Sequence, residues 1–285
     1  MIRSFLFVPA DSERKLLKAG DAGADALILD LEDAVAAEAR PDARAMAHEY
    51  IDGKENVWVR INPIDTDDAV ADLDAIVPAA PTGIVLPKPR SAAAAVELDE
   101  RLSRLESEND IEVGSTRILP LCTEHPEALF TLNSYIGATD RLAGLSWGAE
   151  DLSAAVGASS NRDDDGNWLP TYEMARSFCL LAAAAAEVAA IDTVFTDFKD
   201  NDGLRRYVSN ARRDGFSGML AIHPSQIASI NAAFVPSAEE LQHASRIVEL
   251  FKENPGAGTI GMDGKMIDRP HLVQASRLLE LARQK

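Results

Sequence analysis

Cysteine is scarce in this chain. Its 285 residues contain only Cys122 and Cys179, which lie inside apolar runs and show no paired spacing. This excludes a secreted domain held together by disulfides, so we expect two buried, reduced thiols.

Long apolar runs are absent as well. No run approaches the roughly 20 residues that a membrane-spanning helix needs. The Ala-rich stretch 180–190 is interrupted by Glu187 and predicts a soluble helix. The apolar part of residues 1–14 is too short for a secretory signal and reaches an acid at Asp11. We therefore expect a cytoplasmic protein with no membrane partner.

Positive charge is the third shortage. The chain has 28 Lys and Arg against 46 Asp and Glu, a formal net charge of −18. A field of this sign repels nucleic-acid phosphates and anionic lipid surfaces, so neither is an expected partner. It also opposes an anionic small molecule, which then needs a local cationic pocket or a bound metal. Hydrophobic residues make up 46% of the chain, enough for a sizeable packed core.

Eight short apolar segments recur along the chain, with helical patterns between them. Their runs are nearly continuous rather than alternating, which is typical of strands buried on both faces. Eight such units predict an α/β fold, a TIM (β/α)8 barrel. The alternative is an open doubly wound sheet, which normally has a glycine-rich turn after its first strand; this chain has the glycine-free PADSER there. The predicted strands are residues 4–9, 26–31, 57–62, 83–87, 117–122, 142–147, 193–198 and 218–223.

The chain continues past the eighth predicted strand. Helical patterns cover residues 227–234, 238–252 and 270–283, and the extended stretch TIGMDGKMID precedes the last of these. We divide the chain into a barrel of residues 1–235 and a C-terminal helical extension of residues 236–285. The extension needs a role beyond the barrel, such as covering the site or reaching a neighbouring subunit.

Polar residues gather where the predicted strands end, which in a barrel is where the active site lies. Carboxylates brought together there raise one another's pKa, and a divalent cation resolves that conflict. Because the motifs supply oxygen ligands and no His or Cys, Mg²⁺ is the expected ion, with Mn²⁺ as a substitute. Glu124 and Asp151 are one βα repeat apart and can occupy adjacent strand ends; a salt bridge or helix cap is the other interpretation of each. The strand-end motifs are DLED (30–33), RIN (60–62), PKP (87–89), TE (123–124) and GAED (148–151).

Several of these motifs together resemble a known family over essentially the full length of the chain. The chain is similar to the citrate lyase β-subunit-like proteins of the HpcH/HpaI aldolase superfamily, which also includes malyl-CoA and citramalyl-CoA lyases. The resemblance implies a Mg²⁺-dependent carbon–carbon lyase. Such an enzyme cleaves a β-hydroxyacyl-CoA thioester of the citramalyl-CoA, malyl-CoA or citryl-CoA type to an α-keto acid and acetyl-CoA, or runs the reverse condensation. The matching stretches are RSFLFVPADSERKLLKA, GADALILDLEDAV, VWVRIN, GIVLPK, LSWGAEDLSAAVGA, GMLAIHPSQI and GKMID.

The resemblance also implies roles for single residues. Glu124 and Asp151 would be the Mg²⁺ ligands, and Arg60 would contact the reacting acyl portion as a catalytic residue. Asp30 and Asp33 would lie around the metal or in the substrate pocket, with Asp33 on the catalytic side and Asp30 on the cofactor-binding side.

In the CoA lyases, the aspartate of a C-terminal M-I-D motif reaches into a neighbouring subunit's site as an acid or base. Here that residue is Asp268, which implies a homotrimer or hexamer. The anionic CoA arm of the substrate needs cations near the mouth of the site. Arg14, Lys15 and Lys18 begin the first predicted helix, and Lys88 lies between two prolines at a strand end. Of these, Lys88 is the favoured candidate.

One departure from the family pattern limits the prediction. Many relatives carry E-T-A-x-G after the fifth strand, where this chain has TEHPEA. Four alternatives therefore stay open: an acyl-CoA thioesterase, a CoA-independent aldolase on the same site, a citrate lyase β subunit acting on an acyl-carrier-protein thioester, and a non-catalytic binding protein. The last is disfavoured, because it gives no reason for keeping both carboxylates and the arginine. The acyl group, the stereoisomer and the direction of the reaction are not predicted.

Overall fold

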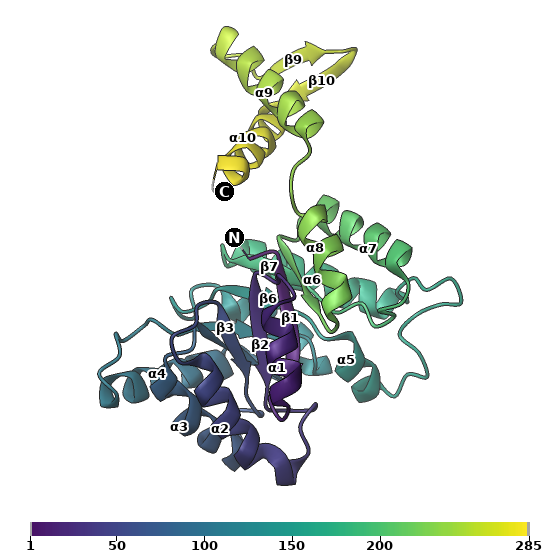
Figure 1. The fold of residues 1–285 in the computed structure, drawn as a ribbon. Helices are drawn as coiled ribbons and strands as arrows, with labels where there is room; N and C mark the ends of the chain where they lie inside the picture. The colour runs from purple at the N-terminus through teal and green to yellow at the C-terminus, as the bar shows by residue number, and fades with distance from the viewer. Residues whose placement is uncertain (1, 284–285) are drawn as a thin grey trace. The chain divides into compact units, whose positions relative to one another are not determined.

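The computed structural model describes residues 2–283 (Figure 1). The chain divides into two compact units, one of residues 2–231 and one that begins at residue 232. None of the helices within the described residues is long and apolar enough to cross a membrane.

Within residues 2–231, eight parallel strands pair in the order β5-β4-β3-β2-β1-β8-β7-β6. Parallel bridges from Ile118 to Leu142 and from Leu121 to Ser146 join β5 to β6, so the sheet closes on itself. The backbone N–H of Cys122 donates to the carbonyl of Ser146 at 2.8 Å across this seam. The predicted TIM barrel is confirmed. The strands are β1 Ser4–Pro9, β2 Ala26–Asp30, β3 Val57–Arg60, β4 Gly83–Leu86, β5 Arg117–Pro120, β6 Gly144–Ser146, β7 Ala189–Asp192 and β8 Gly218–Ala221.

Helices connect the strands and cover the barrel, and local signals in the sequence fix where several of them begin. The side chain of Thr66 accepts a hydrogen bond from the backbone of Ala69 and caps α3, and Asp200 caps α7 in the same way through Gly203. Pro170 opens α6, where its missing N–H costs nothing. The helices are α1 Glu13–Gly20, α2 Arg40–Ile51, α3 Asp67–Ile76, α4 Ala93–Glu108, α5 Ala149–Val156, α6 Pro170–Ala185, α7 Asn201–Asp214 and α8 Ile227–Ala233, with short 3₁₀ turns at Ala37–Ala39, Val77–Ala79, Pro126–Phe130, Leu132–Tyr135 and Pro224–Gln226.

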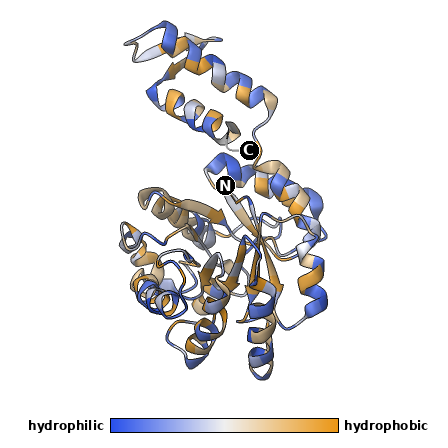
Figure 2. Ribbon diagram, turned by 60° about the vertical axis from the view of Figure 1, so that its left-hand side comes forward, coloured by the Kyte–Doolittle hydropathy of each residue, from blue (hydrophilic) through white to orange (hydrophobic). Residues whose placement is uncertain are grey.

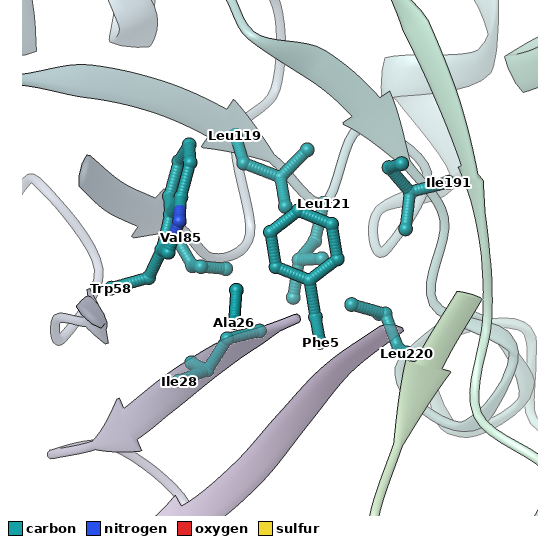
Figure 3. Packing of buried hydrophobic residues seen from close by; sticks show 9 residues of the cluster. All are labelled: Phe5, Ala26, Ile28, Trp58, Val85, Leu119, Leu121, Ile191 and Leu220. Atoms are coloured by element: carbon teal, nitrogen blue, oxygen red, sulfur yellow. The ribbon is translucent and has the colours of Figure 1, made fainter. Parts of the chain in front are cut away.

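Apolar side chains fill the interior of the barrel. Figure 3 shows the side chains of one buried cluster, contributed by strands around the barrel, pointing toward one another. Phe5 meets Trp58 edge to face with the ring centroids 5.6 Å apart, a preferred aromatic geometry. The strands are correspondingly apolar in Figure 2, as expected for strands buried on both faces. The cluster consists of Phe5, Ala26, Ile28, Trp58, Val85, Leu119, Leu121, Ile191 and Leu220.

A buried ion pair ties α4 to the segment before β6. Arg141 donates to both carboxylate oxygens of Glu106, at 2.9 and 2.7 Å, and the side chains are 4% and 0% exposed. Glu106 also accepts from the backbone of Gly114 and Thr116. The pair is therefore fully hydrogen-bonded, which is the condition for a buried charge to be tolerated.

The seventh strand was predicted wrongly. β7 is Ala189–Asp192, and residues 193–198 form the loop that follows it. The helix predicted over 180–190 ends earlier, at Ala185, and Glu187 turns the chain through the left-handed region at φ 58°. Alanine has little β preference, so the sequence AAID gives no strand signal. Thr193, Val194 and Phe195 of this loop line cavities described below instead of forming a strand.

The C-terminal unit is a helical pair with a hairpin. α9 (Ala238–Glu253) and α10 (Arg269–Arg283) flank β9 (Thr259–Met262) and β10 (Lys265–Asp268), which pair antiparallel. Asp263 and Gly264 form the two-residue turn with φ values of 50° and 75°, as a type I′ hairpin requires. The stretch predicted simply as extended is therefore a hairpin. The unit has its own apolar cluster of Ala244, Ile247, Phe251, Met262, Ile267 and Ala275.

Candidate active site

A cavity of about 340 Å³ lies at the C-terminal ends of the barrel strands. Its apolar floor includes Leu121 and Leu220 of the barrel core, so the packed interior closes it from below. Its walls are polar on the sides formed by the ends of β2 and β3 and by the segments after β5 and β6. This is where barrel enzymes carry their catalytic groups. The lining residues are Phe7, Pro9, Asp30, Ala34, Arg60, Leu121, Glu124, Trp147, Gly148, Ala149, Glu150, Asp151, Thr193, Val194, Leu220 and Ile222.

Arg60 is held by Asp30, its register partner on the neighbouring strand. Its Nε donates to Oδ1 of Asp30 at 2.8 Å and its Nη2 to Oδ2 at 2.6 Å, a bidentate pair. Its Nη1 lies 2.9 Å from Oε2 of Glu32, an ion contact without a directed hydrogen bond. Burial disfavours the charged guanidinium, but the bonds to Asp30 and the charges of Glu32 and Glu124 outweigh it and raise the pKa of Arg60. The cavity thus holds a permanent, oriented positive charge.

Glu124 is a buried carboxylate, 3% exposed, that follows β5. Its Oε2 accepts a hydrogen bond from the backbone N–H of Lys88 at 2.6 Å. No ion pair to Glu124 occurs among residues 2–283. Burial, and then the charge of Asp151, raise the pKa of Glu124 well above its ordinary value. A carboxylate in this setting favours either a proton or a nearby cation.

Gly148 makes room for Glu124. A β-carbon at position 148 would lie 2.6 Å from Cγ and 2.8 Å from Oε1 of Glu124, closer than real side chains approach. The backbone of Gly148 is otherwise unremarkable, with φ −118°. The glycine is therefore required for space rather than for conformation.

Asp151 lies in the first turn of α5 and lines the same cavity as Glu124. Its side chain is 32% exposed, so it is open to solvent or a ligand, and its Oδ1 lies 3.4 Å from Nζ of Lys88. The structure thus brings Glu124 and Asp151, which are distant in sequence, to the same cavity as Arg60 and Asp30.

Lys88 is surrounded by carboxylates. Its Nζ donates to Oε1 of Glu32 at 2.5 Å and to Oδ2 of Asp33 at 2.9 Å. Burial disfavours its charge, but these hydrogen bonds and the charge of Asp151 raise the pKa of Lys88 above its ordinary value. Its backbone adopts the left-handed conformation at φ 51°, which aims its N–H at Glu124. The charge of Lys88 is matched within the protein, an arrangement that suits charge balance better than phosphate binding.

The donor set at this cavity fits a hard divalent cation. Four carboxylates, Asp30, Glu124, Glu150 and Asp151, line the cavity with one cation, Arg60. Behind them, Lys88 pairs with Glu32 and Asp33. Among the described residues, no group of three or more His, Cys, Asp or Glu side chains could hold a metal ion alone. Mg²⁺ does not need such a group, because it is commonly bound by one or two carboxylates together with water and substrate oxygens. Glu124 and Asp151 are the residues that could hold it.

Other predicted site residues lie elsewhere. Arg14, Lys15 and Lys18 are exposed on α1 and do not line the cavity. Asp33 is 57% exposed and reaches the site only through its ion pair with Lys88. Asp268 ends β10 in the C-terminal unit.

A histidine that was not among the predicted site residues lies next to Asp268. Oδ1 of Asp268 lies 2.5 Å from Nδ1 of His271, three residues along the chain. The spacing D-x-x-H at a helix start was the available signal, since residues three apart meet in a helical turn. His271 therefore orients the carboxylate of Asp268.

Glu32 is a second residue of the site that was not among the predicted ones. It is 2% exposed and contacts both Arg60 and Lys88, and burial raises its pKa against the lowering effect of those two cations. Alternation along a strand could have identified it, because residues two apart point to the same face. By this rule Glu32 points to the same side as Asp30, and Asp33 points to the opposite side.

Together, the closed barrel and the acidic cavity around an oriented arginine define a TIM-barrel enzyme. A family model described as HpcH/HpaI aldolase/citrate lyase matches residues 3–224. The chain belongs to this family and is a lyase-type enzyme.

Individual relatives cover nearly the whole chain. It is 34% identical over 288 residues to citrate lyase subunit beta of Leuconostoc mesenteroides subsp. cremoris, covering 98% of this chain and 93% of that protein. It is 35% identical over 289 residues to a (3S)-malyl-CoA thioesterase of Cereibacter sphaeroides, covering 98% and 94%. The crystal structure of CitE from Mycobacterium tuberculosis in complex with magnesium, acetoacetate and coenzyme A superposes with a TM-score of 0.84 at 35% identity, covering 99% of this chain and 98% of that one.

Proposed function

We propose that this enzyme cleaves the carbon–carbon bond of a small β-hydroxyacyl-CoA thioester in a Mg²⁺-dependent reaction. The products are an α-keto acid and acetyl-CoA, and the reverse condensation uses the same site. The observation that carries the proposal is the shared cavity of Glu124, Asp151 and Arg60, in which carboxylates outnumber cations. The complex of the related CitE with magnesium, acetoacetate and coenzyme A supports the choice of ion and substrate class.

In this proposal Glu124 and Asp151 hold the ion, and Gly148 and the N–H of Lys88 set the position of Glu124. When bound, Mg²⁺ polarises the carboxylate and hydroxyl oxygens of the substrate and lowers the pKa of the hydroxyl. Lys88 balances the carboxylates around it rather than binding the CoA phosphates, because its Nζ is already engaged by Glu32 and Asp33.

Arg60 supplies the positive charge for the reacting thioester. Cleavage of the bond next to the hydroxyl carbon releases the hydroxyl proton to solvent and leaves negative charge on the thioester oxygen as the enolate of acetyl-CoA forms. A guanidinium held in advance by Asp30 stabilises that charge without having to reorganise. Its raised pKa keeps it charged at every working pH.

Asp268 is the proposed acid that protonates the enolate carbon, and it removes that proton in the reverse direction. We propose that it does so from the C-terminal unit of a neighbouring copy, within a homotrimer or hexamer. The hydrogen-bond partner His271 supports this assignment, because it fixes the carboxylate in one orientation. Arg14 and Lys18, exposed on α1, are the proposed contacts for the phosphates of CoA.

Thioester hydrolysis is a second candidate, favoured by the 35% identity to the (3S)-malyl-CoA thioesterase of Cereibacter sphaeroides. The two reactions leave different products. Carbon–carbon cleavage gives an α-keto acid and acetyl-CoA, whereas hydrolysis gives free CoA and the intact hydroxy acid. The identity to a citrate lyase β subunit keeps an acyl-carrier-protein thioester open as the natural form of the substrate.

The test is a product analysis of the purified chain with malyl-CoA and citramalyl-CoA, with and without Mg²⁺. We expect keto acid and acetyl-CoA only when the metal is present, and loss of both when a chelator is added. The double variant Glu124→Gln and Asp151→Asn should form neither product. Unchanged keto-acid release from that variant would remove the basis of the proposal, and free CoA as the main product would favour hydrolysis.

A further inference from the structure

A second cavity, of about 410 Å³, lies beside the loop between α5 and α6 and the first turns of α7. We call it the Arg162 cavity. It shares no lining residue with the catalytic cavity among the residues described. Its size is within the range of small-molecule sites. Its lining residues are Arg162, Asp165, Gly166, Asn167, Trp168, Glu173, Arg176, Phe195, Asp200, Gly203, Arg206, Tyr207 and Asn210.

Arg162 is a cation with an unused donor inside this cavity. Its guanidinium stacks 3.5 Å from the ring centroid of Trp168, with Phe195 and Tyr207 at 5.7 and 5.8 Å. Its Nη1 donates to the carbonyl of Gly166 at 2.7 Å. Its Nη2 is buried and has no hydrogen-bond partner. A buried donor without a partner is costly, so a site of this kind favours an acceptor supplied by a ligand.

No carboxylate of the cavity forms an ion pair with Arg162 among the described residues. Arg176 is already paired with Asp192 and Asp214. Neither Arg162 nor Arg206 forms an ion pair within residues 2–283, and Arg206 is exposed at the rim. Burial lowers the pKa of Arg162, and the charges of Tyr207, Glu150 and Asp192 oppose this only in part. Two unpaired guanidinium groups on one cavity are unusual in a chain with a net charge of −18.

The acidic and amide side chains that line the Arg162 cavity indicate which class of anion it can bind. Asp165, Glu173 and Asp200 are exposed, and Asp200 already accepts from the N–H of Gly203. These carboxylates repel a multiply charged phosphate. Together with the amides of Asn167 and Asn210, they accept hydrogen bonds from hydroxyl groups.

We propose that the Arg162 cavity binds a small hydroxycarboxylate, with the carboxylate at the Nη2 edge of Arg162 and the hydroxyl toward the polar rim. Arg206 adds a second positive charge at the entrance. The aromatic walls exclude water from the guanidinium, which strengthens its bond to the carboxylate. This site is separate from catalysis and does not depend on which reaction the barrel performs.

The experiment is a titration of the full-length protein, labelled with 5-fluorotryptophan, with glycolate, followed by fluorine NMR. The chain has three tryptophans, so the signal of Trp168 can be assigned by Trp→Phe substitution. We expect a saturable shift of that signal with glycolate and none with ethylene glycol, which lacks the carboxylate. The concentration range should reach about 10 mM, above the roughly millimolar Kd of a weak site.

Variants separate this site from the catalytic one, because Trp147 lies only 5.1 Å from Trp168, ring centroid to ring centroid. Arg162→Gln should weaken binding at least about tenfold, and Arg206→Gln, which alters no packing, should weaken it a few-fold. Arg60→Gln should leave the Trp168 titration unchanged. The proposal is overturned if glycolate causes no saturable shift, or if the shift disappears in Arg60→Gln and survives in both Arg162→Gln and Arg206→Gln. If Arg162→Gln fails to fold, Arg206→Gln decides.

Discussion

The side chain of Glu124 occupies the space that a β-carbon at Gly148 would fill, 2.6 Å from its Cγ. Gly148→Ala must therefore displace Glu124, since the neighbouring backbone is fixed by the barrel seam. We expect Mg²⁺ affinity to fall at least about tenfold, as happens when the support of a metal ligand is lost, and stability to fall by about 1–3 kcal/mol from overpacking. Calorimetric titration with Mg²⁺ measures the first effect.

Gly258→Ala is the matched control, because a β-carbon there meets nothing within 4 Å. Its Mg²⁺ affinity should equal that of the parent protein. Equal affinity in Gly148→Ala would mean that Glu124 is not a ligand.

Glu124→Gln should have opposite effects on the protein with and without metal. In the presence of a chelator the amide replaces a carboxyl group whose ionisation is disfavoured by burial and then by the charge of Asp151, so at neutral pH the melting temperature should rise by a few degrees, as about 1 kcal/mol does for a protein of this size. With saturating Mg²⁺ the parent protein should gain stability and the variant should not. Thermal unfolding under both conditions tests this, with the exposed Glu127→Gln as control. A variant that gains as much from Mg²⁺ as the parent contradicts the ligand assignment.

Arg60→Lys keeps the charge but loses the bidentate bond to Asp30. Because lysine presents a point charge on a flexible stem, it cannot hold the same orientation at the reacting oxygen. We expect kcat to fall by about 10²–10³, the usual effect of removing one oriented donor, with a smaller change in KM. Steady-state kinetics on the thioester measure both. A change confined to KM would assign Arg60 to substrate binding alone.

Asp268→Ala and Glu124→Gln should complement each other if Asp268 serves a neighbouring subunit. Each variant alone should be inactive. Subunits of the two, mixed, unfolded and refolded together, should regain a measurable fraction of activity, since some sites then combine an intact Glu124 with an intact Asp268. Recovery no greater than that of each variant refolded alone would favour action within one chain.

Glu106 provides a prediction about acid stability. Burial raises its pKa, but the hydrogen bonds from Arg141 and from the backbone outweigh this and lower the pKa to about 2, from an ordinary 4.5. Its contribution to the free energy of unfolding is therefore complete above pH 4.5 and is lost as the pH falls toward 2. Glu106→Gln should unfold more easily at neutral pH by about 3 kcal/mol, because it leaves the buried Arg141 with only the partly exposed Asp99 as a charged partner.

Denaturant titrations between pH 2 and 7 follow this effect. The variant should also show a weaker pH dependence than the parent between pH 4.5 and 2. Glu108→Gln, an exposed neighbour on the same helix, serves as control. A parallel pH dependence in Glu106→Gln and the parent would contradict the assignment.

Most of the barrel could be predicted because a strand buried on both faces must be apolar along its whole length. At β7 this rule failed twice: the true strand has no strand signal, and the loop after it has one. Its alanines, Ala189 and Ala190, belong equally well to a helix, and the apolar residues that look like a strand, Val194 and Phe195, line cavities. A run of apolar residues indicates that the side chains are buried, but side chains that line a cavity are buried as well as those of a strand.

The acidic residues of the site could be predicted from their positions at strand ends, but their partners could not. That Lys88 turns into the left-handed region to offer its N–H to Glu124 depends on a backbone angle that no motif encodes. The need for Gly148 arises from a contact between segments more than twenty residues apart, which only the closed barrel brings together.

Thr193, Val194 and Phe195 form a short partition in the molecule. The first two border the catalytic cavity, and the third borders the Arg162 cavity. Although the two cavities share no lining residue, their occupants would contact neighbouring residues of one segment. If binding in one cavity changes the affinity of the other through these three residues, thermodynamic linkage makes the effect reciprocal. The affinity of each ligand then changes by the same factor when the other ligand binds.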